Sequence, residues 1–267
     1  MTEIYSKETI QKEIHTKWAG KTVHFAKETD STNLWIKRLA KEGAPQGTLA
    51  VTEFQSAGRG RLGRSWLVPE GTSVMMSILL RPEFDPRYAS MLTLVMGLSV
   101  ARAVEKLGFD VSIKWPNDVV VSRKKICGIL TEMGVNGGKA DYVVVGVGIN
   151  VNIREFPPEM ADKATSLYLE SGREFPRSQV PGLVMEAFEG YYEKFCADCS
   201  LGSMKEDYER ILANRNQPVR VLDPQTPYEG IARGITDMGE LIVECPDGRL
   251  SHVSAGEVSV RGLYSYV

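Results

Sequence analysis

The sequence lacks any long hydrophobic run. Its longest apolar stretch, Met91 to Val104, is interrupted by two hydroxyl residues and Arg102, and it falls short of the ~20 residues that span a bilayer. We therefore predict a buried helix there. Residues Met1 to Gly20 carry lysine and glutamate throughout and contain no apolar segment of the kind found in secretory signals. We expect a cytoplasmic protein with no membrane attachment.

Cysteine is scarce, and neither sign of charge is in excess. Four cysteines in 267 residues, without an export signal, are expected to be free thiols. Cys196 and Cys199 form a lone CxxC, whereas structural zinc takes four ligands, so we predict no metal site. Thirty-two basic residues against 34 acidic ones give a net charge of -2. That balance excludes a global positive field for holding nucleic acid.

The composition is that of a globular protein, 43% hydrophobic and 25% charged, with one sizeable core and room for a small second domain. Predicted strands and helices mix without regular βαβ alternation, which favours an α+β fold: a mixed sheet with helices packed on one face. The strands expected in this part of the chain are Val23–Lys27, Leu49–Phe54, Ser73–Leu80, Val111–Trp115, Val119–Val121, Ile126–Thr131 and Ala140–Asn150. The helices expected are Leu34–Glu42, Tyr88–Leu107 and Arg177–Leu212, with a further one within Met1–Trp18.

The pattern changes from Gln217 onward, where short strands are separated by Asp, Pro and Gly turns. That spacing predicts a small five-stranded β-barrel. The strands expected there are Pro218–Leu222, Tyr228–Thr236, Glu240–Cys245, Arg249–His252 and Val258–Val260. We place the domain boundary near Asn216, which gives domains at 1–215 and 216–267.

The most specific segment alternates glycine and arginine: Gly58-Arg59-Gly60-Arg61-Leu62-Gly63-Arg64, followed by Trp66. Glycine gives a backbone that can approach a ligand closely, and guanidinium groups bind phosphate and carboxylate oxygens through charge-assisted hydrogen bonds. An exposed loop or an RNA-binding RGG-like patch is the alternative, but such patches usually repeat and this segment occurs once. It favours a small-molecule phosphate site.

A second segment runs from Lys114 to Asp118 and returns through Lys124 to Leu130. The predicted hairpin places Asp118 and Lys125 on facing arms. A lysine there can neutralise charge that builds on an α-phosphate, and a carboxylate can orient the lysine or accept a proton. Taken alone, the segment favours an ordinary surface hairpin with a solvated, lysine-rich turn.

A third segment is rich in glycine and runs from Gly146 to Asn152. A dinucleotide fingerprint requires glycine where Val151 stands, which excludes a Rossmann site. Glycines at a strand end allow a ligand ring to lie against the backbone, and Asn150 can recognise a polar edge. A tight turn explains this segment equally well.

The order of these segments resembles that of the biotin protein ligase family. The matching segments are Asp30-Ser31-Thr32-Asn33, Gln55 with 58–64 and Trp66, 114–118, 125–130 and 146–150. The resemblance covers about Val23 to Arg261, including 165–167 and 256–261. It implies a catalytic core similar to class II synthetases and lipoate ligases, followed by a small SH3-like C-terminal β-barrel.

The resemblance also implies residue roles. Catalytic roles fall on Lys125, Arg61 and Asp118, where Lys125 bridges the biotin carboxylate and the α-phosphate and Asp118 assists the acceptor lysine. Biotin contacts fall on Ser31, Thr32, Asn33, Gln55, Gly58, Arg59, Arg61, Trp66, Lys125, Gly128 and Gly146. Nucleotide contacts fall on Arg59, Arg61, Arg64, Lys114, Asn117, Asn150 and Arg261.

The chemistry that the resemblance implies is ATP-dependent protein biotinylation. Biotin attacks Mg-ATP to give biotinyl-5′-AMP and pyrophosphate, and biotin then passes to a lysine of a biotin carboxyl carrier protein. Catalysis depends on positioning and cationic stabilisation, and a closing Gly/Arg loop protects the reactive adenylate. Mg²⁺ is expected to be held largely by phosphates and water, without a dedicated carboxylate cage.

Partners and alternatives follow from the same comparison. The resemblance implies a homodimer through the catalytic sheet. Bifunctional members carry an N-terminal helix-turn-helix domain, whereas about 22 residues precede Val23 here, so we expect no nucleic-acid partner. A lipoate ligase and a non-catalytic biotin sensor are the alternatives. The Gly/Arg segment with Gln55 favours biotin over lipoate, and the presence of Lys125 and Asp118 argues against a sensor.

Overall fold

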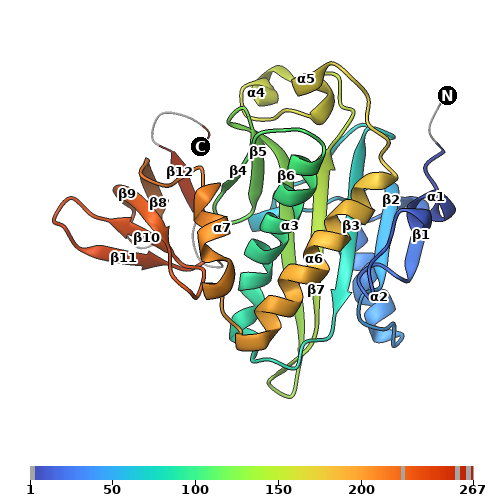
Figure 1. Ribbon diagram of the computed structural model, residues 1–267, viewed down its shortest axis with the longest axis horizontal. Helices are drawn as coiled ribbons and strands as arrows, with labels where there is room; N and C mark the ends of the chain where they lie inside the picture. Colours follow the sequence, from blue (N-terminus) through green and yellow to red (C-terminus); the bar gives the residue numbers. More distant parts are fainter. Residues whose placement is uncertain (1–3, 224–225, 256–258, 263–265, 267) are drawn as a thin grey trace.

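The larger, N-terminal part of the chain is built on a seven-stranded mixed sheet (Figure 1). The computed structural model describes residues 4–223, 226–255, 259–262 and 266. The strand order is β1-β2-β3-β7-β6-β5-β4; β1 and β2 are parallel and the other neighbours are antiparallel. The strands are β1 (Val23–Thr29), β2 (Leu49–Gln55), β3 (Ser73–Leu80), β4 (Val111–Lys114), β5 (Asp118–Val121), β6 (Lys124–Asn136) and β7 (Lys139–Asn150). The predicted α+β fold with a mixed sheet is confirmed.

Both faces of this sheet are covered by helices, so the expected placement on one face is wrong. Helices α3 (Leu92–Lys106) and α6 (Gln179–Asp198) pack on the face that buries Val51 and Ile78. Helix α2 (Thr32–Lys41) packs on the opposite face, against alternate residues such as Leu79. Strand β3 is buried along its whole length, as expected for a strand covered on both sides.

Several helices are shorter than their sequence patterns suggest. The predicted helix Tyr88–Leu107 begins as a 3₁₀ turn, η2 (Pro86–Met91), before α3 starts. Within Met1–Trp18 the described helix is α1 (Lys7–Lys12). The predicted helix Arg177–Leu212 is broken, because Cys199 adopts a left-handed conformation with φ 52° after α6. The remaining helical elements are η1 (Arg61–Gly63), α4 (Pro158–Ala161), α5 (Leu167–Ser171), η3 (Gly202–Met204) and α7 (Lys205–Arg210).

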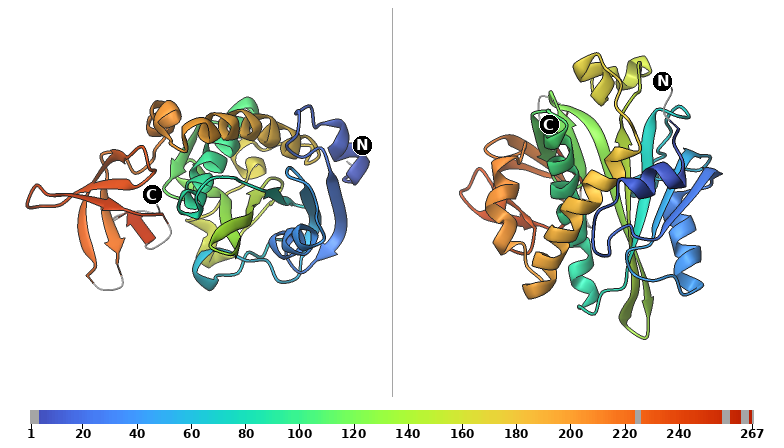
Figure 2. Two further views of the ribbon diagram at one scale, coloured as in Figure 1. Left: turned by 90° about the horizontal axis from the view of Figure 1, so that it is seen from below. Right: turned by 45° about the vertical axis from the view of Figure 1, so that its right-hand side comes forward.

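The C-terminal strands form a separate antiparallel sheet, which lies beside the β4 edge of the large sheet (Figures 1 and 2). Its order is β11-β10-β9-β8-β12. The strands are β8 (Pro218–Leu222), β9 (Tyr228–Ile235), β10 (Leu241–Glu244), β11 (Leu250–Val253) and β12 (Ser259–Gly262). They match the predicted positions, although Val258 lies outside the described residues. No pairing between β11 and β12 closes this sheet into a ring among the residues described.

The two sheets are joined through Trp115, which is almost fully buried. Its indole Nε1 donates to the carbonyl of Gly239 (3.0 Å), and its backbone N–H donates to Asn214 Oδ1 (2.8 Å). Next to this contact, the N–H of Ile113 in β4 donates to the carbonyl of Ile211 (2.7 Å). The C-terminal sheet is therefore anchored directly beside the segment 114–118.

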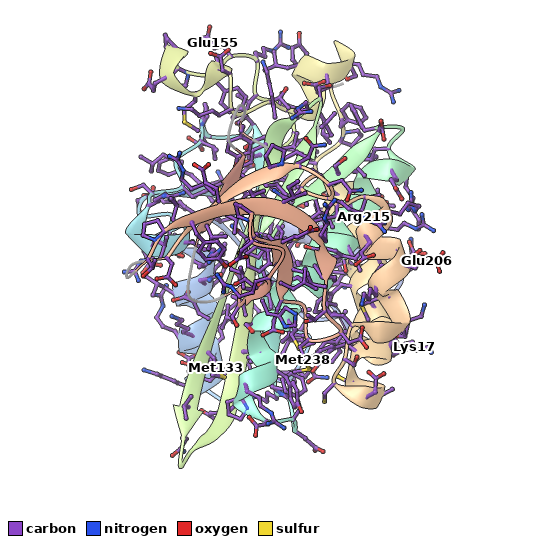
Figure 3. The ribbon with its side chains drawn as sticks, turned by 90° about the vertical axis from the view of Figure 1, so that its left-hand side faces the viewer. Lys17, Met133, Glu155, Glu206, Arg215 and Met238 are labelled. Atoms are coloured by element: carbon purple, nitrogen blue, oxygen red, sulfur yellow. The ribbon has the colours of Figure 1, made fainter. Side chains whose placement is uncertain are left out.

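The β6–β7 hairpin extends beyond its neighbours, with Met133 on its outer part (Figure 3). Strand β3 pairs with β7 only from Val143 to Asn150, so the tip of the hairpin has no partner strand on that side. Elsewhere, all four cysteines are free thiols. No helix in the described part of the chain is both long and apolar enough to cross a membrane.

Candidate active site

A cavity of about 50 Å³ lies on the α2 face of the large sheet. It is enclosed by the N-terminus of α2, the end of β2, the Gly/Arg loop, and the middle of β6 and β7. Its lining residues are Ser31, Thr32, Asn33, Gln55, Arg59, Gly60, Arg61, Trp66, Asn117, Lys125, Gly128, Ile129, Leu130, Gly146, Val147 and Gly148. The structure thus brings together segments that lie more than 100 residues apart in the sequence.

Glycines in β7 allow Asn33 and Trp66 to pack directly against the strand beside the cavity. A Cβ at Gly146 would lie 2.0 Å from Asn33 Oδ1, and one at Gly148 would lie 2.5 Å from the Trp66 ring. Real Cβ atoms do not tolerate such distances, so these positions admit glycine alone without rearrangement. The backbone of β7 is therefore in direct contact with two side chains of the cavity wall, and the predicted contact of this segment with a ligand stays a prediction.

Gln55 and Thr32 begin a buried polar network along the cavity. Gln55 Oε1 accepts hydrogen bonds from the backbone N–H (2.8 Å) and the hydroxyl (3.2 Å) of Thr32. Ser31 is the N-cap residue of α2, yet its side chain makes no capping hydrogen bond. Ser31, Thr32 and Gln55 all line the cavity.

Ser77, which is not among the predicted site residues, continues this network from β3. Its hydroxyl lies 2.6 Å from Asn33 Oδ1 and 2.7 Å from the hydroxyl of Thr32. Asn33 Nδ2 donates to Glu132 Oε2 (2.7 Å), and Glu132 also pairs with Lys37 Nζ (2.5 Å). Burial opposes ionisation of Glu132, but the hydrogen bonds from Lys37 and Asn33 lower its pKa. Strand β3 carries two serines, Ser73 at its start and Ser77 within the apolar run, and a serine inside such a run was the available signal for Ser77.

The Gly/Arg loop folds as a tight hairpin over the cavity. Arg59 and Ser65 form an antiparallel bridge, and the N–H of Trp66 donates to the carbonyl of Gly58 (2.9 Å). Leu62 at the tip has φ 55° and is exposed. The loop carries Trp66 against the glycines of β6 and β7, and the indole Nε1 has no hydrogen-bond partner among the described residues.

Arg61 points from this loop toward both sheets. Its guanidinium donates to Asn117 Oδ1 (3.0 Å) and to the carbonyl of Ala255 (2.7 Å) in the C-terminal sheet region. Burial lowers the pKa of Arg61, while the nearby carboxylate of Asp118 favours the charged form. An arginine remains protonated under these conditions, so this site carries a fixed positive charge.

The β5–β6 hairpin places Asp118 beside Lys125, as the sequence predicts. The distance from Lys125 Nζ to Asp118 Oδ1 is 2.6 Å, and both side chains are mostly buried. Lys125 Nζ also lies 5.4 Å from the centroid of the Trp66 ring. The turn that joins the strands uses positive φ at both Ser122 (48°) and Arg123 (63°), which is the geometry of a two-residue hairpin turn.

Some predicted site residues lie outside the cavity. Gly58 is buried behind the loop, where an added Cβ would meet the carbonyl of Trp66 at 2.2 Å. Arg64 is exposed on the loop and does not line the cavity. Lys114 is buried, with its Nζ 3.5 Å from the centroid of the Tyr266 ring. None of these three residues lines the cavity.

Two further predicted nucleotide contacts, Asn150 and Arg261, are not among the residues that line the cavity. Asn150 Nδ2 donates to the carbonyl of Thr165 (3.1 Å), and its buried Oδ1 has no partner among the described residues. Arg261 lies in β12, paired with Arg220; its side chain is outside the described part. Residues 256–258 of the predicted C-terminal motif are outside it as well.

Comparison with known proteins assigns the family. Residues 25–150 match the Biotin/lipoate A/B protein ligase family, and residues 216–261 match the Biotin protein ligase C terminal domain. The bifunctional ligase/repressor BirA of Bacillus subtilis is 34% identical over 246 residues, covering 91% of this chain and 75% of the relative. The chain belongs to the biotin protein ligase family.

Other members of the biotin protein ligase family agree in extent and in fold. The biotin–[acetyl-CoA-carboxylase] ligase of Mycobacterium tuberculosis is 34% identical, with 86% of each chain covered. The biotin protein ligase from Aquifex aeolicus, solved in complex with biotin and ATP, superposes with a TM-score of 0.79 at 34% identity, covering 91% of this chain and 99% of that one. The SH3-like expectation for the C-terminal sheet agrees with the matched C-terminal domain of the family.

Proposed function

We propose that this protein is an ATP-dependent biotin protein ligase that forms biotinyl-5′-AMP and transfers biotin to a lysine of a biotin carboxyl carrier protein. The observation that carries the proposal is one cavity lined by Arg59, Arg61 and Lys125 together with the polar pair Thr32 and Gln55. Cations for a carboxylate and a phosphate thus lie next to amide and hydroxyl groups that can recognise a ureido ring.

The two sides of the cavity differ in chemistry: one is neutral and polar, and the other is positively charged. The network of Thr32, Asn33 and Gln55 can both donate and accept, and it lies beside Gly146 and Gly148 of β7, where displacement of the Trp66 ring would expose the backbone to a ligand ring. Lys125 and Arg61 lie on the other side, toward the β5–β6 hairpin. We place the ureido ring against α2 and β7 and the carboxylate near Lys125.

The first reaction step forms a mixed anhydride. A carboxylate oxygen of biotin attacks the α-phosphorus of ATP, and the bond to the β-phosphate breaks so that pyrophosphate leaves with its electron pair. Lys125 and Arg61 offset the negative charge on the reacting oxygens, which is the largest contribution that a preorganised site makes. Asp118 holds Lys125 Nζ at 2.6 Å, which directs the ammonium toward the same point.

The second step transfers biotin. The ε-amine of the acceptor lysine attacks the acyl carbon, the bond to the phosphate oxygen breaks, and AMP leaves. Asp118 is held against Lys125, which lines the cavity, so it takes up the proton released by the amine or orients the amine for attack. AMP departs with the electron pair of the broken bond, which balances the step.

Mg²⁺ belongs to this proposal as the partner of ATP. No cluster of three or more metal-binding side chains occurs in the part of the chain that is described, and Asp118 is already engaged by Lys125. These residues fit an ion held mainly by phosphate oxygens and water. The ion supplies charge neutralisation on the phosphates of bound ATP.

The cavity must widen before biotin and ATP enter. Its volume of about 50 Å³ is far below the roughly 300–1,000 Å³ of ligand pockets, and the Trp66 ring fills the space above Gly148. The loop from Gly58 to Arg64 carries Trp66, so loop opening and indole displacement occur together. Closure over the adenylate then excludes water.

Assembly and location complete the proposal. A homodimer through the large sheet is supported by exposed Met133 and Val135 on the protruding β6–β7 hairpin, because an edge strand with apolar side chains is suited to pairing. We also propose the cytoplasmic location that the sequence led us to expect. We also assign 1–215 to the catalytic domain and 216–267 to the SH3-like domain.

One assay tests the central claim. Protein, biotin, Mg-ATP and a biotin carboxyl carrier domain are incubated together, and mass spectrometry locates biotin on the carrier. We expect one labelled lysine, and no label from a reaction without ATP. A carrier that remains unlabelled while a known ligase labels it would refute the function. Lipoate in place of biotin separates a lipoate ligase, which would release pyrophosphate with lipoate instead.

A further inference from the structure

Tyr266 contacts the catalytic hairpin from the C-terminal part of the chain. Its hydroxyl donates to Asp118 Oδ2 (2.5 Å), and the ring centroid lies 3.5 Å from Lys114 Nζ. Lys114 is 7% exposed, and it is the first residue of the segment that leads to Asp118. Tyr266, which follows β12 in the sequence, therefore contacts both the first and the last residue of the segment 114–118.

The hydroxyl contact completes the surroundings of the Asp118 carboxylate. Oδ1 accepts from Lys125 Nζ (2.6 Å) and from Asn117 Nδ2 (3.1 Å). Tyr266 is the donor to Oδ2 among the residues described. A carboxylate anchored through one oxygen can rotate about its bond to Cβ, whereas donors on both oxygens fix its plane.

We propose that Tyr266 is a positioning residue of the ligase site, which acts through Asp118 and Lys114. The hydroxyl fixes the Asp118 carboxylate so that Oδ1 stays on Lys125 Nζ and the remaining lone pair of Oδ2 faces the acceptor amine. The ring covers the Lys114 ammonium, a cation–π contact that is strengthened by burial. This role rests on the proposed function, because Lys125 and Asp118 act there on the acyl phosphate.

The transfer step depends on this arrangement more than binding does. As the acceptor nitrogen attacks the acyl carbon, its proton passes toward Asp118 while AMP leaves with the electron pair of the broken bond. If the Asp118 carboxylate rotated freely, its oxygen would face the attacking amine only part of the time, and proton transfer would be slower. Loss of the hydroxyl should therefore lower kcat for transfer and leave KM for the carrier nearly unchanged.

Two substitutions in the full-length protein separate the two contacts. Tyr266→Phe keeps the ring over Lys114 and removes the hydroxyl, whereas Tyr266→Leu removes both. The matched control is Tyr228→Phe, because the Tyr228 hydroxyl bonds Ser251 Oγ at 2.6 Å within the C-terminal sheet. Pyrophosphate release measures adenylate formation, and transfer from preformed biotinyl-5′-AMP to the carrier domain measures the second step.

We expect Tyr266→Phe to lower kcat of transfer about tenfold, the loss that follows from one hydrogen bond to a charged group. KM for the carrier should change less than about twofold, since no binding contact is removed. Tyr266→Leu should in addition raise KM for ATP in adenylate formation, and the phenylalanine variant should restore that value. Tyr228→Phe should match the parent protein in both steps.

The outcomes separate this role from the ligase function itself. A parent protein that labels the carrier, with Tyr266→Phe equally fast in transfer, overturns the positioning role and leaves the function intact. Equal losses in Tyr266→Phe and Tyr228→Phe also overturn it, because they point to general loosening of the C-terminal sheet. A parent protein that makes no biotinyl-5′-AMP overturns the proposed function and this role with it. Unfolding midpoints of all variants confirm that each protein is folded.

Discussion

Arg61 joins three parts of the molecule through a single guanidinium. It extends from the Gly/Arg loop, donates to Asn117 Oδ1 beside the β5–β6 hairpin, and donates to the carbonyl of Ala255. Bidentate geometry suits both a phosphate and these neutral acceptors. The same side chain can therefore fasten the closed loop and bind the adenylate.

Replacing Arg61 with glycine should release the adenylate faster. The change removes charge-assisted hydrogen bonds worth ~1.5–3 kcal/mol each, so release should accelerate about tenfold or more. Filter binding of radiolabelled biotinyl-5′-AMP gives the rate. Arg64→Gly is the comparison, since Arg64 is exposed on the same loop and does not line the cavity. An unchanged rate in Arg61→Gly contradicts the assignment of Arg61, and an equal effect of Arg64→Gly contradicts the distinction between the two.

Gly146 offers a second test at this scale. Its added Cβ would collide with Asn33 Oδ1 at 2.0 Å, and Asn33 is held by Ser77 and Glu132. We expect Gly146→Ala to weaken biotin binding at least about tenfold. The added methyl group would push Asn33 away, so that its hydrogen bonds to Ser77 and Glu132 would become too long to persist. Isothermal titration with biotin measures this. Gly190→Ala is the control, since nothing lies within 4 Å of a Cβ at that helix position. Equal biotin affinities in the two variants would contradict the assignment of Gly146 to the biotin site.

At the scale of elements, sequence patterns located strands better than helix ends. Strand β3 was predicted to the residue, because apolar runs with flanking turn residues define a buried strand locally. Helix α6 ends at Asp198, and the left-handed residue after it is Cys199 instead of a glycine, so the predicted helix ran on to Leu212. The face on which α2 packs was also missed, since no local pattern states which side of a sheet a helix covers.

The α6 helix also anchors the N-terminal segment through Glu189. Its carboxylate accepts three backbone hydrogen bonds, from Lys17 (2.8 Å), Trp18 (2.7 Å) and Ala19 (3.0 Å). Burial opposes ionisation of Glu189, but these three N–H donors lower its pKa below the ordinary value of 4.5. The charged form is therefore favoured in the folded protein.

The pH dependence of stability follows from this depressed pKa. Glu189 is deprotonated more readily when folded, so its contribution is fully present above about pH 4.5 and is lost as the pH falls through its folded pKa. We expect Glu189→Gln to reduce the free energy of unfolding by about 2–3 kcal/mol at pH 7, and the difference should shrink below about pH 4.5. Urea unfolding across this range measures it.

Glu186→Gln is the matched control for this measurement. Glu186 lies on the same helix and pairs with Lys106 on the surface, and such exposed pairs contribute at most about 1 kcal/mol. If Glu189→Gln costs no more than Glu186→Gln at pH 7, the three backbone hydrogen bonds do not anchor the segment.

At the scale of the whole molecule, the catalytic sheet and the C-terminal sheet share one site. Ala255 accepts from Arg61, and Tyr266 donates to Asp118. The sequence motifs predicted that the Gly/Arg loop and the hairpin would converge, because each carries the residue types that phosphate chemistry requires. They could not predict Tyr266 or Ser77, whose proximity to the site arises only from tertiary packing.

Replacing Trp115 tests whether the two sheets unfold as one cooperative unit. Its indole N–H donates to the Gly239 carbonyl across the junction, and Trp115→Phe leaves that carbonyl without its donor. We expect a loss of about 1–3 kcal/mol from the buried unsatisfied group, with a further loss from the smaller ring. Urea unfolding should show the C-terminal sheet separating at lower denaturant than the large sheet, when tryptophan fluorescence and far-UV circular dichroism are compared.

Trp35→Phe serves as the control for this junction. Trp35 packs in the α2 cluster on the other side of the molecule, with its ring edge toward His24, so its replacement should leave unfolding a single transition. Coincident transitions by both probes in Trp115→Phe, at the same denaturant as in Trp35→Phe, would show that the junction hydrogen bond does not couple the sheets. A separated transition in Trp115→Phe alone means that the fold of the C-terminal sheet depends on the segment that carries Lys114 and Asp118, so that stability and catalysis share this contact.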